Sequence, residues 1–352
     1  MILNAYAVLD AFVAVLRLVV GIVIVGFAVS AWCKLCLRSP APGANAPGSS
    51  KELLEGRYYL LALLGVLLLG INLASWPLLY LLLQSYVPEW PGVMCIYGVT
   101  HVGAGSEGTS RFLPGILQTL QITKPILMFG SGVWFVLYLA NRRTQTAPLL
   151  SRILLVAIAL GLLAVADSLA EGAYLLIPKK EEWLSTGCCS VANENIRTIY
   201  SEPVFGVRDR AWLSAAYYAI NIGVILAIVT CIRRERPRQK LSMLAPLLAG
   251  ALVALPISAI FLTQVAAPVL LHLPYHHCAY DLIPDVPEMT LAIALFIVGT
   301  FAVGWACTLS WWGRCEETAP FLGDLIGKIL FLGFWCYLGS LVMTSAELAI
   351  AK

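Results

Sequence analysis

Charged residues are scarce in this sequence. Aspartate, glutamate, lysine and arginine together make up 12% of its 352 residues, and 60% of the residues are hydrophobic. A soluble chain carries about a quarter charged residues, so this composition excludes an ordinary soluble protein. The apolar residues form runs of about twenty or more, the length that a helix needs to cross about 30 Å of hydrocarbon. The sequence therefore predicts an all-α integral membrane protein surrounded by the lipid bilayer.

Several functional motifs are also missing. The sequence contains no P-loop, no H-E-x-x-H, no G-x-S-x-G, no dinucleotide-binding glycine pattern and no C-x-x-C-H. Any ATP-driven step must then come from a partner, and it stays open whether the chain is an enzyme. The net charge of +3 gives no indication of nucleic-acid binding. The N-terminus lacks the basic region and cleavage site of a secretory signal, so the first apolar run is expected to be a retained span.

The hydrophobic runs predict about eight transmembrane helices. Loops after the odd-numbered spans hold thirteen basic residues, against seven in loops after the even-numbered spans. Because basic loops stay in the cytoplasm, both termini are expected on the extracytoplasmic side of an inner (cytoplasmic) membrane. In the last span Asp324 and Lys328 are four residues apart and can pair on one helix face. The predicted spans are residues 8–31, 58–86, 115–140, 148–177, 211–232, 243–272, 289–312 and 321–346.

The eight spans divide into two halves that we interpret as tandem four-helix repeats in parallel orientation. The motif P-x-x-x-C-x-Y occurs from Pro91 to Tyr97 and again from Pro274 to Tyr280. Each copy lies between the second and third spans of a half, which a duplication explains, although chance matching of three residues is the alternative. The predicted halves are residues 1–205, with outer loops 88–114 and 178–210, and residues 206–352, with outer loop 273–288.

Histidine is rare, and its placement is uneven. All four histidines fall in the outer loops or at their rim, beside several cysteines. Imidazole and thiolate ligands suit copper, zinc or a haem iron. No histidine lies mid-span, so haem inside the bilayer is not expected, but haem at the outer surface, held by His101 or His272 with a partner subunit, is an alternative. The candidate metal ligands are Cys95, His101, His276, His277 and Cys278.

The outer cysteines also permit disulfide chemistry. Four of them are expected in an oxidising space, namely Cys95, Cys188, Cys189 and Cys278. The adjacent pair rarely bonds to itself because the ring is strained, so each member would reach another loop, one to Cys95 and one to Cys278. Structural disulfides, redox-active thiols and metal ligation all stay open.

Three ionisable residues are expected within the membrane. Asp167 and Glu171 are four residues apart and share a face of the fourth span, and Lys124 begins the apolar run of the third span. Buried charges are costly unless they pair or line a cavity. The simpler interpretation is an ion pair that locks the two spans together, and the alternative is a proton or cation path.

Three functions are compatible with these patterns. The first is a membrane component that handles a metal or electrons through the extracytoplasmic cysteines and histidines, within a larger complex. The second is a non-catalytic scaffold subunit whose periplasmic loops are stapled by disulfides and docked on a partner. The third is a quinone-linked thiol-disulfide oxidoreductase.

Overall fold

A computed structural model describes most of the chain, and the described residues are mainly helical and contain no strand. The described residues are 4–37, 48–90, 93, 95–104, 108–179, 210–233, 241–273 and 278–351. Within them, eight helices are long and apolar enough to cross a membrane. Each overlaps one of the predicted spans, so the expected fold class is confirmed. A helix is suited to this setting because it satisfies its own backbone hydrogen bonds where no water is present.

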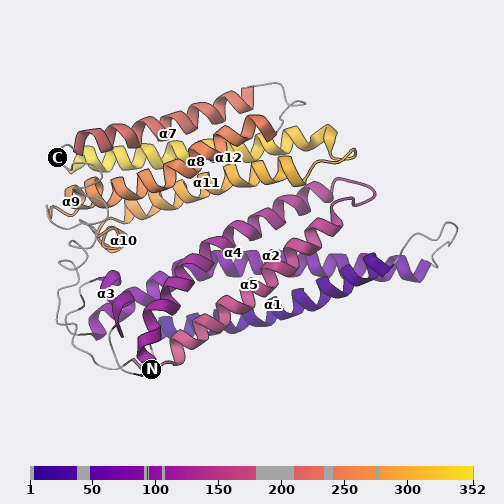
Figure 1. The fold of residues 1–352 in the computed structure, drawn as a ribbon, viewed down its shortest axis with the longest axis horizontal. Helices are drawn as coiled ribbons and strands as arrows, with labels where there is room; N and C mark the ends of the chain where they lie inside the picture. Colours follow the sequence, from indigo (N-terminus) through magenta and orange to yellow (C-terminus); the bar gives the residue numbers. More distant parts are fainter. Residues whose placement is uncertain are drawn as a thin grey trace. The chain divides into compact units, whose positions relative to one another are not determined.

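The chain forms two compact units; the long helices of the first run from indigo to magenta in Figure 1, and those of the second run from salmon to yellow. Unit 1 comprises Met1–Tyr86, Thr100–Glu182 and Cys315–Thr318. Its four long helices form a ring in which each packs against its two neighbours in chain order and the last packs against the first. These helices are α1 (Ala5–Leu37), α2 (Gly48–Tyr86), α4 (Leu113–Asn141) and α5 (Leu150–Leu176).

The first helix of unit 1 approaches the last one closely at two glycines. A Cβ atom on Gly161 of α5 would lie 2.9 Å from the carbonyl oxygen of Gly21 and 2.6 Å from Val25 Cγ2. Small residues let two membrane helices approach until their backbones almost touch. Arg17 lies one turn from Gly21 on α1, so this contact holds its side chain against α5.

Two contacts define one end of unit 1, at which α1 and α4 begin and α2 and α5 end. The Asn4 side chain donates a hydrogen bond to Ser85 Oγ at 2.8 Å. Ser110, in the short helix η2 (Thr109–Phe112) that precedes α4, donates to the carbonyl oxygen of Pro178 at 2.9 Å. We call this the N-terminal end of unit 1.

Unit 2 comprises Val87–Val99, Trp183–Arg314 and Ala319–Lys352. Its long helices form a ring with the same order of neighbours as unit 1. They are α7 (Arg210–Arg233), α8 (Leu241–Phe261), α11 (Pro287–Trp312) and α12 (Ala319–Ile350). This order is also the simplest one for four antiparallel helices, so the duplication stays a prediction.

The sixth span is not a regular helix throughout. It contains Pro246 and Pro256, and after α8 the chain passes through a π-helical turn, Leu262–Ala266, into α9 (Ala267–Leu270). Proline removes a backbone donor and crowds the preceding turn, which favours such irregular helix. In the eighth span, the predicted pair is present, with Lys328 Nζ 2.9 Å from Asp324 Oδ2.

Apolar side chains cover the outside of both rings. Large exposed examples are Phe12 (65%) and Leu169 (60%) in unit 1 and Leu226 (59%) in unit 2. Such surfaces are unfavourable in water and fit contact with lipid chains. The protein is therefore a multi-pass membrane protein.

Candidate functional site

Two loop cysteines that lie far apart in the sequence meet in unit 2. Cys95 directly precedes the short helix α3 (Ile96–His101), and Cys278 precedes α10 (Leu282–Asp285). The Cys278 thiol lies with its sulfur 3.8 Å from that of Cys95. The structure thus pairs the cysteines of the two P-x-x-x-C-x-Y motifs with each other.

A carboxylate completes this group. The ligand atoms of Cys95, Cys278 and Asp281 all lie within 4.8 Å of one another. Cys95 is buried, at 2% exposure, whereas Cys278 and Asp281 are half-buried. The group therefore has a covered side and an accessible side. We call these three residues the thiol cluster.

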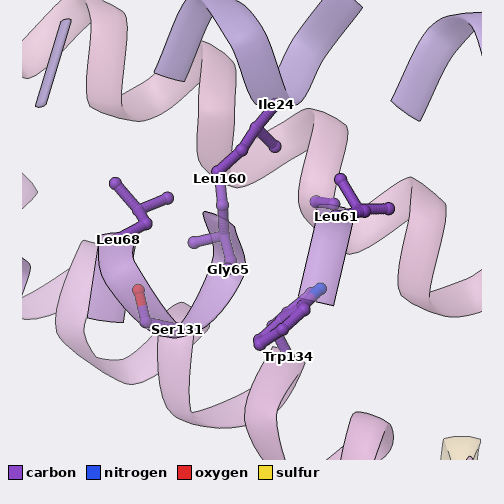
Figure 2. Close-up of a pocket in the computed structure, with 8 residues that line it drawn as sticks. Ile24, Leu61, Gly65, Leu68, Ser131, Trp134 and Leu160 are labelled. Carbon is purple, nitrogen blue, oxygen red and sulfur yellow. The ribbon is translucent and has the colours of Figure 1, made fainter. Parts of the chain in front are cut away.

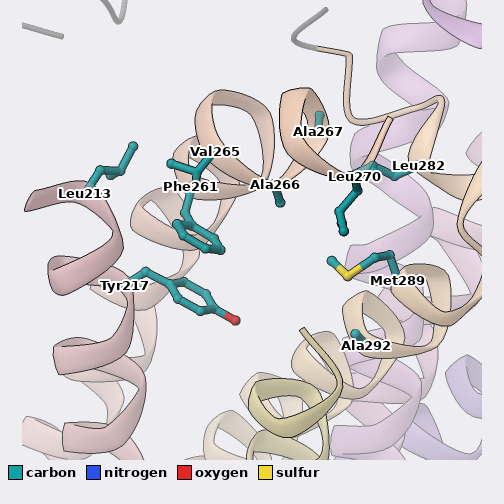
Figure 3. Packing of buried hydrophobic residues seen from close by; sticks show 10 residues of the cluster. All are labelled: Leu213, Tyr217, Phe261, Val265, Ala266, Ala267, Leu270, Leu282, Met289 and Ala292. Carbon is teal, nitrogen blue, oxygen red and sulfur yellow. The ribbon is translucent and has the colours of Figure 1, made fainter. Parts of the chain in front are cut away.

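Packing in unit 2 fixes the position of one half of the thiol cluster. Asp281 lies immediately before α10, and its carbonyl oxygen accepts a hydrogen bond from the backbone N–H of Asp285. Leu282, the first residue of α10, is fully buried in an apolar cluster with Leu270 and Met289. Figure 3 shows these three side chains together near the beginning of α11. The buried leucine thus anchors the turn that presents Cys278 and Asp281.

The two thiols of the cluster influence each other electrostatically. The hydrogen bond to Cys95, together with burial, raises the pKa of the Cys278 thiol above its ordinary value. A raised pKa means that the Cys278 thiol keeps its proton more readily than an isolated cysteine does. A metal ion that binds the Cys278 thiolate must displace this proton.

The other predicted outer ligands have different outcomes. His101 lies in unit 1 and is exposed, with its Nδ1 3.0 Å from Thr100 Oγ1. His272 is exposed and has a positive φ of 53°. His276, His277, Cys188 and Cys189 lie outside the described residues, so their predicted ligation or disulfide pairing stays a prediction.

A network of buried charges occupies the interior of unit 1. Lys124 Nζ lies 2.7 Å from Glu171 Oε1 and 3.4 Å from Asp167 Oδ2, so the structure brings together the three residues singled out from the sequence. Arg17 also contacts both carboxylates, with its Nη2 2.6 Å from Asp167 Oδ2. All four side chains are at most 2% exposed. We call them, with Asp10, the charge network.

Hydroxyl groups satisfy further donors of the charge network. Ser75 Oγ accepts hydrogen bonds from Arg17 Nη1 at 2.7 Å and from Lys124 Nζ at 2.8 Å. Arg17 Nε donates to Ser168 Oγ at 3.0 Å, and the Thr123 hydroxyl donates to Asp167. A buried ion pair is stable only when its remaining polar atoms are hydrogen-bonded in this way.

Asp10 differs from the other members of the charge network. It is fully buried, and neither of its carboxyl oxygens accepts a hydrogen bond from a described donor group. It interacts electrostatically with Glu171, Lys124 and Arg17. A buried carboxyl group without a donor is costly if it is ionised, so this residue requires an explanation.

Sequence reasoning missed Asp10 and Arg17, although a signal was present. Both are charged residues in the first apolar run and are seven residues apart, which places them two turns apart on one face of α1. Charged residues at such depth mark a functional site by default. Asp281 was also missed, although it follows Cys278 at a spacing of three residues.

Lys179 and two buried tyrosines lie between the N-terminal end of unit 1 and the charge network. Lys179 follows α5, and its Nζ lies 4.4 Å from the ring centre of Tyr174 and 5.7 Å from that of Tyr86. Both tyrosines interact electrostatically with Asp10. Burial lowers the pKa of Lys179 to about 8.

Beyond the charge network, in the direction away from the N-terminal end, unit 1 becomes apolar. Asn72 donates a hydrogen bond to Ser131 Oγ at 2.9 Å. Ser131 then borders a small pocket, shown in Figure 2, whose other lining residues are Ile24, Leu61, Gly65, Leu68, Trp134, Ala157 and Leu160. The Trp134 ring lies so close to Gly65 that an added Cβ atom would be 2.3 Å from it. On this side, therefore, mostly apolar side chains separate the charge network from the rest of unit 1.

The interior of unit 2 contains several uncharged polar groups among its apolar side chains. Among its described residues, no aspartate, glutamate, lysine or arginine side chain is buried. Asn221 donates to Ser258 Oγ at 3.3 Å, and the hydroxyls of Thr300 and Tyr337 lie 2.8 Å apart. Tyr217 stacks on Phe261 with ring centres 4.0 Å apart. The two units thus use different chemistry in their interiors.

Comparison with known proteins finds no match for this chain among protein-family models, curated proteins or solved structures.

Proposed function

We propose that this membrane protein handles a soft metal ion, zinc or Cu(I), at the thiol cluster. The observation that carries the proposal is the distance of 3.8 Å between the sulfurs of Cys95 and Cys278, with a carboxylate oxygen of Asp281 within 4.8 Å of both. Zinc binds thiolate sulfur at about 2.3 Å in tetrahedral geometry, so two such sulfurs stand about 3.8 Å apart. The thiols are thus at the separation that one zinc ion requires.

The chemistry of the donors supports the same choice. Thiolates select zinc and Cu(I) over hard ions, and a carboxylate is a common additional zinc ligand. Three donors leave the fourth position of a tetrahedral zinc site open. His276 or His277 is the natural candidate for it, since they are the two residues before Cys278. The half-buried state of Cys278 and Asp281 leaves access for an exchanging ion.

The proposal includes an orientation. The excess of basic residues in the loops after odd-numbered spans favours an inner membrane with both termini outside the cytoplasm. The thiol cluster would then face the extracytoplasmic space, where a periplasmic or membrane partner subunit could deliver or receive the ion. A surface haem iron on His101 is less favoured, because among the described residues no group of three metal-binding side chains includes His101, which lies beside Thr100.

A second function draws on the same sulfurs. A disulfide bond needs them about 2.05 Å apart, a modest further approach from 3.8 Å, and an extracytoplasmic space would favour the oxidation. The pair would then staple two loops of unit 2 in a scaffold subunit of a larger complex. A quinone-linked oxidoreductase would in addition need exchange with Cys188 or Cys189.

Metal analysis of the purified full-length protein, combined with thiol counting, separates these functions. We expect about one zinc or copper ion per chain, lost in Cys278→Ser and reduced in Asp281→Asn. Cys33→Ser, which removes an exposed thiol in unit 1, is the matched control and should keep the metal. The proposal is wrong if no metal binds and two thiols of unit 2 become reactive only after reduction.

A further inference from the structure

The charge network of unit 1 does not balance if every member is ionised. It contains two cations, Arg17 and Lys124, and three carboxyl groups, those of Asp10, Asp167 and Glu171, all at most 2% exposed. An uncompensated charge in a membrane interior is costly. One additional positive charge, such as a proton on one carboxyl group, restores neutrality.

Hydrogen bonding identifies the carboxyl group that carries this charge. Asp167 and Glu171 each contact both cations, so opposite charges compensate these two carboxylates directly. Neither carboxyl oxygen of Asp10 accepts a hydrogen bond from a described donor, and the Glu171 carboxyl is close enough to share a proton with it. A carboxyl group without donors beside a second carboxylate is the one that stays protonated.

The depth of these groups suggests a route from one side. Asp10 lies five residues after the beginning of α1, and Glu171 five residues before the end of α5. Both are therefore about 8 Å from the N-terminal end of unit 1. Arg17 and Lys124 lie twelve and eleven residues from the same end, about 17 Å along their helices.

The groups that face Asp10 come from every element around it. They are Arg17 on α1, Tyr86 on α2, Lys124 on α4, and Glu171 and Tyr174 on α5. Lys179 contacts both tyrosines from the N-terminal end. Tyr86, Tyr174 and Lys179 thus lie between the end of the bundle and the buried carboxyl. On the far side of the charge network the side chains around Trp134 are mostly apolar.

We propose that Asp10, next to Glu171, is a proton-binding site of unit 1 that exchanges with water at the N-terminal end of the bundle past Tyr86, Tyr174 and Lys179. The Asp10 carboxylate takes a proton from a hydronium ion and leaves water, and the reverse step returns the proton. Arg17 and Lys124 keep their contacts with Asp167 and Glu171 during this exchange. The site rests on unit 1 alone and stands whether or not the thiol cluster binds metal.

Infrared spectroscopy of the full-length protein in lipid vesicles tests this directly, because protonated and ionised carboxyl groups absorb at different frequencies. We expect a protonated-carboxyl band at neutral pH that shifts when H₂O is exchanged for D₂O. The band should be lost in Asp10→Asn and kept in Asp285→Asn, which changes an exposed aspartate of unit 2. A band that is absent, unaffected by Asp10→Asn, or unable to exchange its proton overturns the proposal.

A second variant tests the charge balance without altering Asp10. In Glu171→Gln, the two cations face only Asp167, so Asp10 is expected to ionise and the band to disappear. A band retained in Glu171→Gln contradicts the argument even if Asp10→Asn fails to fold. A band that disappears in wild-type protein when Na⁺ replaces choline at fixed pH would instead make the site a sodium site and overturn the proton assignment.

Discussion

Replacing Lys124 by methionine should destabilise unit 1 strongly. The Lys124 ammonium is 2% exposed and lies 2.7 Å from Glu171, 2.8 Å from Ser75 and 3.4 Å from Asp167. Its removal leaves Arg17 as the only cation for two ionised carboxylates. Breaking a buried ion pair on one side costs about 3–5 kcal/mol, chiefly because a charge is left without compensation. The cost should decrease as the pH falls, since a proton can replace the missing charge.

The matched control is Lys328→Met. Lys328 pairs with Asp324 at a similar distance, 2.9 Å, but its side chain is 64% exposed. Such exposed pairs contribute about 0–1 kcal/mol. The double variant Lys124→Met with Glu171→Gln retains one cation and one carboxylate, so it should be more stable than Lys124→Met alone.

Unfolding in mixed detergent micelles, followed by far-ultraviolet circular dichroism, measures these differences. The reasoning is refuted if Lys124→Met costs no more than Lys328→Met. It is equally refuted if removing Glu171 as well fails to restore any stability.

Three further predictions concern other parts of the chain. Gly161→Ala should lower the free energy of unfolding by about 1–3 kcal/mol, because its Cβ would meet Val25 and the Gly21 backbone. Gly172→Ala is the control in the same assay. Its Cβ would meet no atom within 4 Å, so it should be neutral or stabilising by up to about 1 kcal/mol. Burial lowers the pKa of Lys179 from 10.5 to about 8. Between these pH values the unfolded chain binds more protons than the folded chain, so the free energy of unfolding should rise with pH from about 8 to about 10.5. A Lys179→Met variant that shows the same rise in its unfolding midpoint would contradict this. Finally, a membrane-impermeant maleimide applied to intact cells after mild reduction should label Cys278 and spare Cys33, and the opposite pattern would invert the orientation.

Hydrophobic run length was sufficient to predict the eight spans, because a helix in lipid must satisfy its own backbone and must be long enough to cross. The pairing of Lys124 with Asp167 and Glu171 could also be anticipated, since charges in apolar runs must find partners. Arg17 and Asp10 were equally visible as charged residues in the first apolar run. Their place in the same network, however, depends on the close packing of α1 on α5 at Gly21 and Gly161.

The thiol cluster was less predictable. Loop position indicated that Cys95 and Cys278 share one side of the membrane, but their contact joins residues 183 positions apart. The pattern of hydrophobic residues along the chain does not indicate which of several loop cysteines come into contact. Asp281 could be recognised only once the buried Leu282 had fixed the turn that presents it.

The central claim is that Cys95 and Cys278 bind one soft metal ion together. X-ray absorption spectroscopy at the metal edge of the purified protein tests it most directly. We expect the metal to have two sulfur ligands at about 2.3 Å in the wild-type protein. It should have one sulfur ligand in Cys278→Ser supplemented with metal, and two sulfur ligands in Cys33→Ser. A metal environment made of oxygen and nitrogen alone, unchanged by Cys278→Ser, would contradict it.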